Sequence, residues 1–249
     1  MTTTGFRVSI DGPVATVTLD RPEARNAQTP QMWLALSEFA RQLTGEIRIV
    51  LVKGEGSSFS AGLDRSVAGA ELAAIAALTP EESAERIAIY QSGFSWLRRP
   101  DLITIAAVQG HAIGAGFQLA LACDLRVAAE DVSFAMAEVQ LGLVPDLTGT
   151  KRLVELVGYA RALELCATGR RVGAAEAERI GLVNLVVPRA DLDDAASDLT
   201  AALIAGNRDA IVEIKGLLLG AGERSGAEQE RLEREAQTRR IRDLAGIGE

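Results

Sequence analysis

The chain has 249 residues, of which 48% are hydrophobic and 24% charged; this balance excludes wholesale disorder and fits one large α/β domain or two small ones. Acidic residues outnumber basic residues by 34 to 26, so the formal net charge of −8 argues against a nucleic-acid or anionic-membrane partner. Two cysteines and one histidine exclude a disulfide framework and a multi-histidine zinc site, and we expect no metal.

The first half of the chain alternates between strand and helix patterns. A turn at Asp11-Gly12-Pro13 separates two β-rich runs and predicts a hairpin, and Thr29-Pro30 predicts a helix start. We expect strands over 6–10, 14–19, 47–53 and 102–110, and helices over 30–43 and 71–99, the second broken near Thr79-Pro80.

The second half becomes mainly helical. We expect a strand-turn-strand pair over 125–139, a further strand over 181–188, and helices over 151–157, 160–168, 174–180, 191–206 and 208–219. This pattern indicates an α/β core over residues 1–190 and a helical C-terminal region over 191–249. The longest central apolar run, 103–108, has the length of a strand, and the N-terminus lacks a signal-peptide pattern, so we expect a cytoplasmic protein.

Two glycine-rich loops each follow a β-rich run. They are FSAGLD over 59–64 and GHAIGAG over 110–116, and the second opens a helix. Successive backbone N–H groups at such a junction bind a phosphate or stabilise a developing oxyanion. Neither recognised phosphate-loop spacing occurs, and Glu55 would repel a phosphate nearby. The alternative is that these glycines only make tight turns.

Five stretches in one order match a known pattern over most of the chain. They are VTLDRPEARNA (17–27), GSSFSAGLD (56–64), AAVQGHAIGAGFQLALACDLRVA (106–128), FAMAEVQLGLVPDLTGTKRL (134–153) and GYARALELCATGRRVGAAEAERIGLVNLVVP (158–188). On these residues the chain resembles the enoyl-CoA hydratase/isomerase family, also called the crotonase family. The resemblance implies a spiral of ββα units, a helical C-terminal trimerisation region, and assembly as a homotrimer or a hexamer made of two trimers.

The resemblance also implies an acyl-CoA thioester as ligand, with coenzyme A as part of the substrate and no separate cofactor. Two backbone N–H groups, those of Leu63 and Ala115, would then form an oxyanion hole for the thioester carbonyl. Two fixed donors stabilise the enolate left by α-proton removal more than the neutral thioester. By the same resemblance, the residues expected to line the acyl-CoA site are Arg25, Ala27, Ala61, Gly62, Asp64, Gly114 and Gln118.

The expected acid–base residues differ from the hydratase pattern of the family. Hydratases carry two glutamates; here the second position is Glu138, but the first is Gln118. Gln118 can hydrogen-bond a water but cannot exchange a proton with it at neutral pH. Asp146 supplies another carboxylate, at a position where several isomerases of the family carry an acid. We therefore favour double-bond isomerisation by Glu138, with Asp146 as a candidate partner, over hydration.

Simpler readings remain for several of these residues. Glu138 could form a surface salt bridge, and Asp146 could cap the helix that follows it. Gln118 also keeps open a non-catalytic acyl-CoA-binding protein. His111 with a nearby serine such as Ser60 would suit a serine hydrolase, although no G-x-S-x-G motif occurs and a role in backbone hydrogen bonding is the better interpretation. Asp124 is expected to fix local structure.

Overall fold

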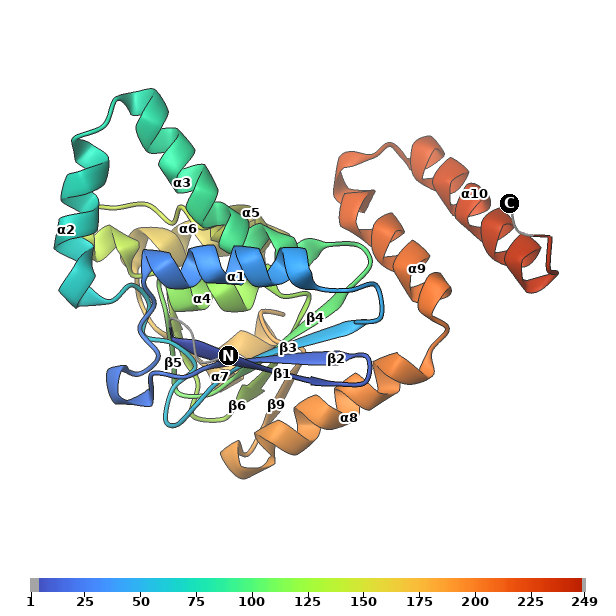
Figure 1. Ribbon diagram of the computed structural model, residues 1–249, viewed down its shortest axis with the longest axis horizontal. Helices are drawn as coiled ribbons and strands as arrows, with labels where there is room; N and C mark the ends of the chain where they lie inside the picture. Colours follow the sequence, from blue (N-terminus) through green and yellow to red (C-terminus); the bar gives the residue numbers. More distant parts are fainter. Residues whose placement is uncertain (1–4, 248–249) are drawn as a thin grey trace.

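Six strands form the larger sheet, in the order β1-β2-β3-β4-β6-β9. The computed structural model describes residues 5–247, and its ribbon is shown in Figure 1. The strands are β1 (Phe6–Asp11), β2 (Val14–Leu19), β3 (Ile49–Gly54), β4 (Ile103–Val108), β6 (Leu125–Ala129) and β9 (Leu185–Val187). β1 and β2 form the expected antiparallel hairpin, and every other pair in this sheet is parallel.

A smaller sheet contains β5 (His111–Ile113), β7 (Ser133–Ala135) and β8 (Val172–Gly173). The expected strands of 125–139 therefore exist, but the expectation that they pair with each other was wrong. β6 joins β4 and β9 in the large sheet, whereas β7 joins β5 and β8 in the small one. Their connecting turn carries the chain from one sheet to the other.

Helices cover the large sheet and extend the chain beyond it. They are α1 (Pro30–Gln42), α2 (Arg65–Ala76), α3 (Pro80–Ser95), α4 (Ala115–Ala122), α5 (Gly149–Val157), α6 (Tyr159–Thr168), α7 (Ala174–Arg179), α8 (Leu192–Ala205), α9 (Arg208–Gly220) and α10 (Gly226–Leu244). Thr29 caps α1 as expected, and Thr79 caps α3 at the expected break near Thr79-Pro80, each ahead of a proline. α2 begins at Arg65, earlier than expected, because the Asp64 carboxylate accepts from the Ser66 N–H.

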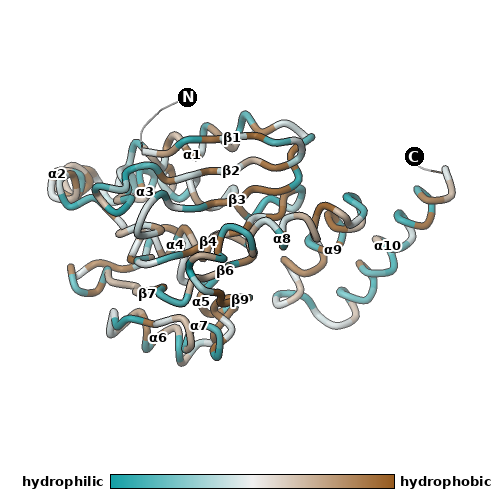
Figure 2. The backbone as a smooth tube through the Cα atoms, turned by 90° about the horizontal axis from the view of Figure 1, so that it is seen from below, coloured by the Kyte–Doolittle hydropathy of each residue, from teal (hydrophilic) through white to brown (hydrophobic). Residues whose placement is uncertain are grey.

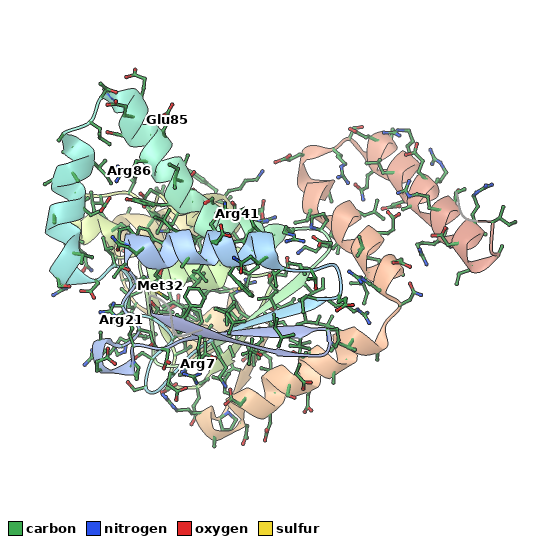
Figure 3. The ribbon with its side chains drawn as sticks, in the orientation of Figure 1. Arg7, Arg21, Met32, Arg41, Glu85 and Arg86 are labelled. Atoms are coloured by element: carbon green, nitrogen blue, oxygen red, sulfur yellow. The ribbon has the colours of Figure 1, made fainter. Side chains whose placement is uncertain are left out.

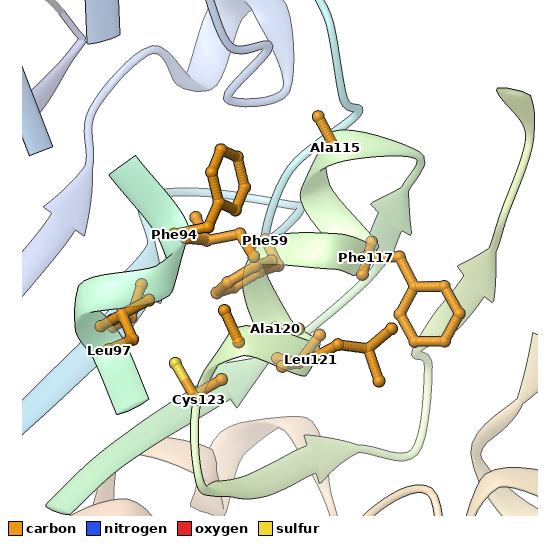
Figure 4. Close-up of a cluster of buried hydrophobic side chains, with 14 of the residues drawn as sticks. Phe59, Phe94, Leu97, Ala115, Phe117, Ala120, Leu121 and Cys123 are labelled. Atoms are coloured by element: carbon orange, nitrogen blue, oxygen red, sulfur yellow. The ribbon is translucent and has the colours of Figure 1, made fainter. Parts of the chain in front are cut away.

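Successive side chains along a strand point to opposite faces of the sheet, so the hydrophobic core has two parts. Val50 and Val52 of β3 face the cluster under α1, α3 and α4, while Ile49 faces the smaller cluster under α8. Figure 1 shows α1 and α8 on opposite sides of the strands, and Figure 2 shows hydrophobic segments along the neighbouring strands β1, β2 and β3. Figure 4 shows Phe94, at the end of α3, and Leu97, just beyond it, in one buried cluster with Ala120 and Leu121 of α4.

The chain beyond α8 forms an arm of two helices. α9 and α10 pack against each other and lie to one side of the α/β body (Figures 1 and 2). α8 instead packs on the sheet through Leu192 and Ala196. The division of the chain at residue 190 stays a prediction, because α8 shares its apolar core with the strands.

A buried arginine closes the far end of α4. The side chain of Arg126 is 1% exposed and makes no carboxylate contact within hydrogen-bonding distance among residues 5–247. Its guanidinium donates instead to the carbonyls of Cys123 at 2.8 Å and Leu182 at 2.7 Å, and more weakly to those of Ala120 and Asp124. Burial lowers the pKa of Arg126 to about 10. The cation therefore satisfies carbonyls at the C-terminus of α4.

Candidate active site

The two glycine loops lie side by side. Ser60 N–H donates to the His111 carbonyl at 2.8 Å, and Ile113 N–H donates to the Ser60 carbonyl at 3.0 Å. Gly62 completes the approach at a φ of +87°, where an added Cβ would lie 2.5 Å from the Ile113 carbonyl oxygen. Only glycine fits this position without a shift of the backbone.

This pairing leaves the N–H groups of Leu63 and Ala115 without a hydrogen-bond acceptor among residues 5–247. The Gln28 N–H donates to the Gly62 carbonyl, and the Gln28 carbonyl accepts from the Asp64 N–H. In this parallel bridge the N–H of Leu63, between them, is not bonded to Gln28. Ala115 is the first residue of α4, so its N–H has no partner within the helix. Figure 4 shows Ala115 at this end of α4. Both groups are thus available as donors, as an oxyanion hole requires.

Glu138 lies directly against the second loop. Gly114 has a φ of +51°, and a Cβ there would lie 3.2 Å from Oε1 of Glu138. Gln118 Nε2 donates to the same Oε1 at 2.7 Å, whereas the buried Oε2 has no hydrogen-bond partner among residues 5–247. Burial raises the pKa of Glu138, which also senses the charge of Asp146. The salt-bridge interpretation of Glu138 was therefore wrong within the described residues.

Asp146 lies in the loop that precedes α5. Its backbone carbonyl accepts a 2.7 Å hydrogen bond from Gln91 of α3, and burial raises the pKa of its carboxyl. The N-cap of α5 is Thr148, in the left-handed region at a φ of +70°, and no side chain caps this helix. The capping interpretation of Asp146 was therefore wrong, and its carboxylate remains near Glu138 as a second titratable group.

The expected acyl-CoA residues other than Gly114 and Gln118 lie in or next to the first loop. The Arg25 carbonyl accepts from Ala61 N–H at 2.9 Å, and the Arg25 side chain is exposed at a backbone φ of +50°. Ala27 accepts through its carbonyl from Arg21 Nη1. The Asp64 carboxylate binds Arg21 at 2.8 Å and caps α2, and bonds from Ser66 followed by Arg21 lower the pKa of Asp64 to about 2.

The pairing of His111 with Ser60 fails on geometry. The Ser60 hydroxyl donates to the Asn26 carbonyl and accepts from Gln28 Nε2. The His111 ring contacts Ser58 instead, at 3.1 Å between Oγ and Nδ1. His111 serves the loops through its backbone carbonyl, as the preferred interpretation has it.

Two supporting residues escaped the sequence interpretation. The buried side chain of Gln28 links Ser60 Oγ to Trp33 Nε1, and Asn26 Nδ2 donates to the carbonyls of Glu55 and Ser58. Both hold the first loop in place. No spacing rule marks such residues, since their role depends on chain segments that meet only in the folded protein.

A backbone donor pair with half-buried carboxylates beside it, built on a spiral α/β core, defines a class of protein. The family model described as enoyl-CoA hydratase/isomerase matches residues 9–244. The chain therefore belongs to the enoyl-CoA hydratase/isomerase family of acyl-CoA enzymes, and the expected crotonase fold is confirmed.

Individual relatives agree with this assignment. The carnitinyl-CoA dehydratase of Salmonella paratyphi A is 38% identical over 216 residues, covering 86% of this chain and 79% of the relative. A structure from Thermobifida fusca YX, of a proposed enoyl-CoA hydratase with acetoacetyl-CoA, is 46% identical with a TM-score of 0.92 and covers 96% of each chain. An enoyl-CoA hydratase from Polaromonas sp. JS666 is 33% identical, with a TM-score of 0.86, and covers 97% of this chain and 93% of its own.

Proposed function

We propose that this protein isomerises the double bond of an enoyl-CoA thioester, moving it from C3–C4 to C2–C3. The thioester oxygen would accept from the N–H groups of Leu63 and Ala115. Glu138 would remove a proton from C2, the electrons would delocalise onto that oxygen, and Glu138 or Asp146 would return a proton to C4. Each backbone donor would lower the barrier by about 2.7–4 kcal/mol.

One observation carries this choice among reactions of the family. Gln118 occupies the position of one hydratase glutamate, and its amide oxygen is taken by Leu147 N–H at 2.8 Å and Gly149 N–H at 3.2 Å. An amide so held cannot act as the second acid–base group that water addition uses. The carboxylates left at the site are those of Glu138 and Asp146, which suit a proton shuttle between two carbons.

The acyl-CoA ligand is proposed on related grounds. The Thermobifida fusca relative was crystallised with CoA and with acetoacetyl-CoA. In this chain, the exposed Arg25 side chain beside Ala61 suits a phosphate of CoA, and the two free N–H groups suit a thioester oxygen. Coenzyme A would enter and leave as part of the substrate.

Hydration or dehydration is the second candidate, because relatives carry those names. The deciding experiment supplies purified protein with 3-enoyl-CoA and 2-enoyl-CoA esters in separate reactions in deuterated water. Isomerisation predicts 2-enoyl product from the 3-enoyl ester, with deuterium at C4 in part of it. Rapid hydration of the 2-enoyl ester without any isomerisation would reverse the assignment. Tight ester binding without either reaction would favour a binding protein.

We also propose that the chain assembles as a homotrimer or hexamer through its C-terminal arm. A hollow of about 840 Å³ lies between α9, α5 and the sheet, with Ile214 and Leu218 of α9 among its apolar lining. Leu218 is 69% exposed, which suits an interface with a second copy. Light scattering on L218E should report dissociation, whereas I10E, at a comparably exposed apolar residue of the hairpin, should leave the assembly intact.

A further inference from the structure

We propose that Gln118 is a positioning residue that fixes the Glu138 carboxylate through one oxygen and leaves its other oxygen for the substrate proton. This inference rests on the proposed function only for the expected effect on the pH dependence of kcat/KM. The arrangement itself follows from the hydrogen bonds of three chain segments: α4, the turn that carries Glu138, and the loop before α5.

The orientation of the Gln118 amide is determined by its backbone partners. Gln118 is 1% exposed, and two N–H groups, from Leu147 and Gly149, point at the same end of its amide. Only an oxygen accepts two donors, so that end is Oε1 and the opposite end is the amino group. A flipped amide would place three donors together and leave the carboxylate facing an oxygen.

The amino end then determines how Glu138 is held. Nε2 lies 2.7 Å from Oε1 of Glu138, a normal charge-assisted hydrogen bond. The Glu138 carboxylate lies over Gly114, next to the oxyanion donor of Ala115. With Oε1 engaged, Oε2 is a buried oxygen without a hydrogen-bond partner among the described residues, and it is the oxygen to which we assign the proton from C2.

Packing holds Gln118 itself rigidly. A Cβ added to Gly149 would lie 2.7 Å from Cγ of Gln118, so the side chain is packed closely against the start of α5. The bond from Gln118 also lowers the pKa of Glu138 against the larger opposite effect of burial. Gln118 therefore favours the ionised form of the half-buried Glu138 carboxyl as well as orienting it.

Gln118→Met separates this role from simple support of the loop. The apolar side chain has a similar length but donates nothing to Glu138. Gln91→Met is the matched control, because Gln91 bonds the carbonyl of Asp146 in the same loop and is not a hydrogen-bond partner of Glu138. The measurement is an NMR titration of protein labelled with ¹³C at the glutamate carboxyls, with the Glu138 signal assigned by its loss in E138Q.

Q118M should raise the pKa of Glu138 by about one unit, the equivalent of one lost charge-assisted hydrogen bond, and Q91M should not move it. The acid limb of kcat/KM for isomerisation should shift by the same amount in Q118M alone. Equal titrations of Glu138 in the parent, Q118M and Q91M would overturn the proposal. A shifted titration in a protein that turns over no enoyl-CoA would leave the positioning role standing and remove the proposed isomerisation.

Gln118→Glu provides a second variant if Q118M does not fold. Its carboxyl can still accept from Leu147 and Gly149 N–H, but it faces Glu138 with a second acid. The two carboxyls should share one proton and titrate as a coupled pair, losing the last proton above the pH at which Glu138 ionises in the parent. Two independent titrations would contradict the contact on which the proposal depends.

Discussion

Lys215 of α9 donates a hydrogen bond of 2.8 Å to Asp124, which follows α4 ninety-one residues earlier in the chain. The ammonium is buried and also donates to the Leu102 carbonyl at 2.6 Å, while Thr104 donates to the same carboxylate through its N–H and its hydroxyl. Asp124 therefore has the structural role expected of it. Its carboxylate links Lys215, in the C-terminal arm, to Thr104 in strand β4.

Removing the charge of Asp124 should destabilise the fold strongly. D124N leaves the Lys215 ammonium buried without a counter-charge, and we expect a loss of about 3–5 kcal/mol in the free energy of unfolding. K215M should cost less, because Thr104 still satisfies the carboxylate. Urea denaturation of both single variants and the double variant measures the coupling. Strictly additive losses would show that the pair contributes nothing as a pair.

Gly62→Ala should impair catalysis far more than stability alone explains. The new Cβ would collide with the Ile113 carbonyl and displace the adjoining N–H of Leu63. Loss of one oxyanion donor predicts a fall in kcat of about 10²–10³. Gly12→Ala is the control, since Gly12 also has a positive φ, +51°, but open space around it. Comparable kcat values in the two variants would argue against Leu63 N–H as a donor.

Glu138→Gln should abolish turnover while retaining acyl-CoA binding. General acid–base catalysis contributes about 10²–10⁴ in rate, and an amide cannot supply it. Steady-state kinetics and calorimetric titration with an acyl-CoA ester separate the two properties. Loss of binding together with turnover would instead indicate a distorted site.

The same variant should be more stable than the parent at neutral pH. Glu138 ionises near 4.5 when unfolded and at a higher pH when folded, because burial raises its pKa. Ionisation therefore costs folding free energy above the folded pKa, and this cost disappears as the pH falls below 4.5. Denaturation across this range should show the advantage of E138Q fading towards acid. An advantage that grows towards acid would contradict the direction of the shift.

The contribution of Asp64 to the free energy of unfolding should have the opposite pH dependence. Its pKa is lowered from 3.8 to about 2, so its contribution is complete above 3.8 and lost as the pH falls through the folded value. D64A should lose about 1 kcal/mol at pH 7 from the helix cap alone. S225A removes the N-cap of α10 without removing a titrating group, so its loss should vary little with pH. Parallel pH profiles for the two variants would refute the prediction.

Local patterns were sufficient for most of the secondary structure. The two Thr-Pro sequences placed the starts of α1 and α3 correctly because the cap and the proline act within one helical turn. The pairing of β6 and β7 could not be predicted in the same way. Both strands exist, but their partners come from distant segments, and a short turn between strands does not decide which sheet each one joins.

The candidate site was likewise predictable only in part from the sequence. The glycine loops and the family resemblance brought Leu63 and Ala115 to attention, and their N–H groups have no acceptor in the part of the chain that the structure describes. The side-chain contacts were beyond sequence reasoning: the bond from Gln118 to Glu138 joins residues on separate elements, and so does the bond from Gln91 to the Asp146 loop. Such contacts depend on tertiary packing, which residue type and spacing do not encode locally.

Arg126 supports the candidate site from the opposite end of α4. α4 has eight residues and so spans about 12 Å, with the Ala115 donor at one end and carbonyls bound by the guanidinium at the other. Because a helix this short behaves as a rigid rod, a tilt at its distal end would swing the donor away from the thioester oxygen. The guanidinium of Arg126 thus holds the distal end of the helix that presents the Ala115 N–H.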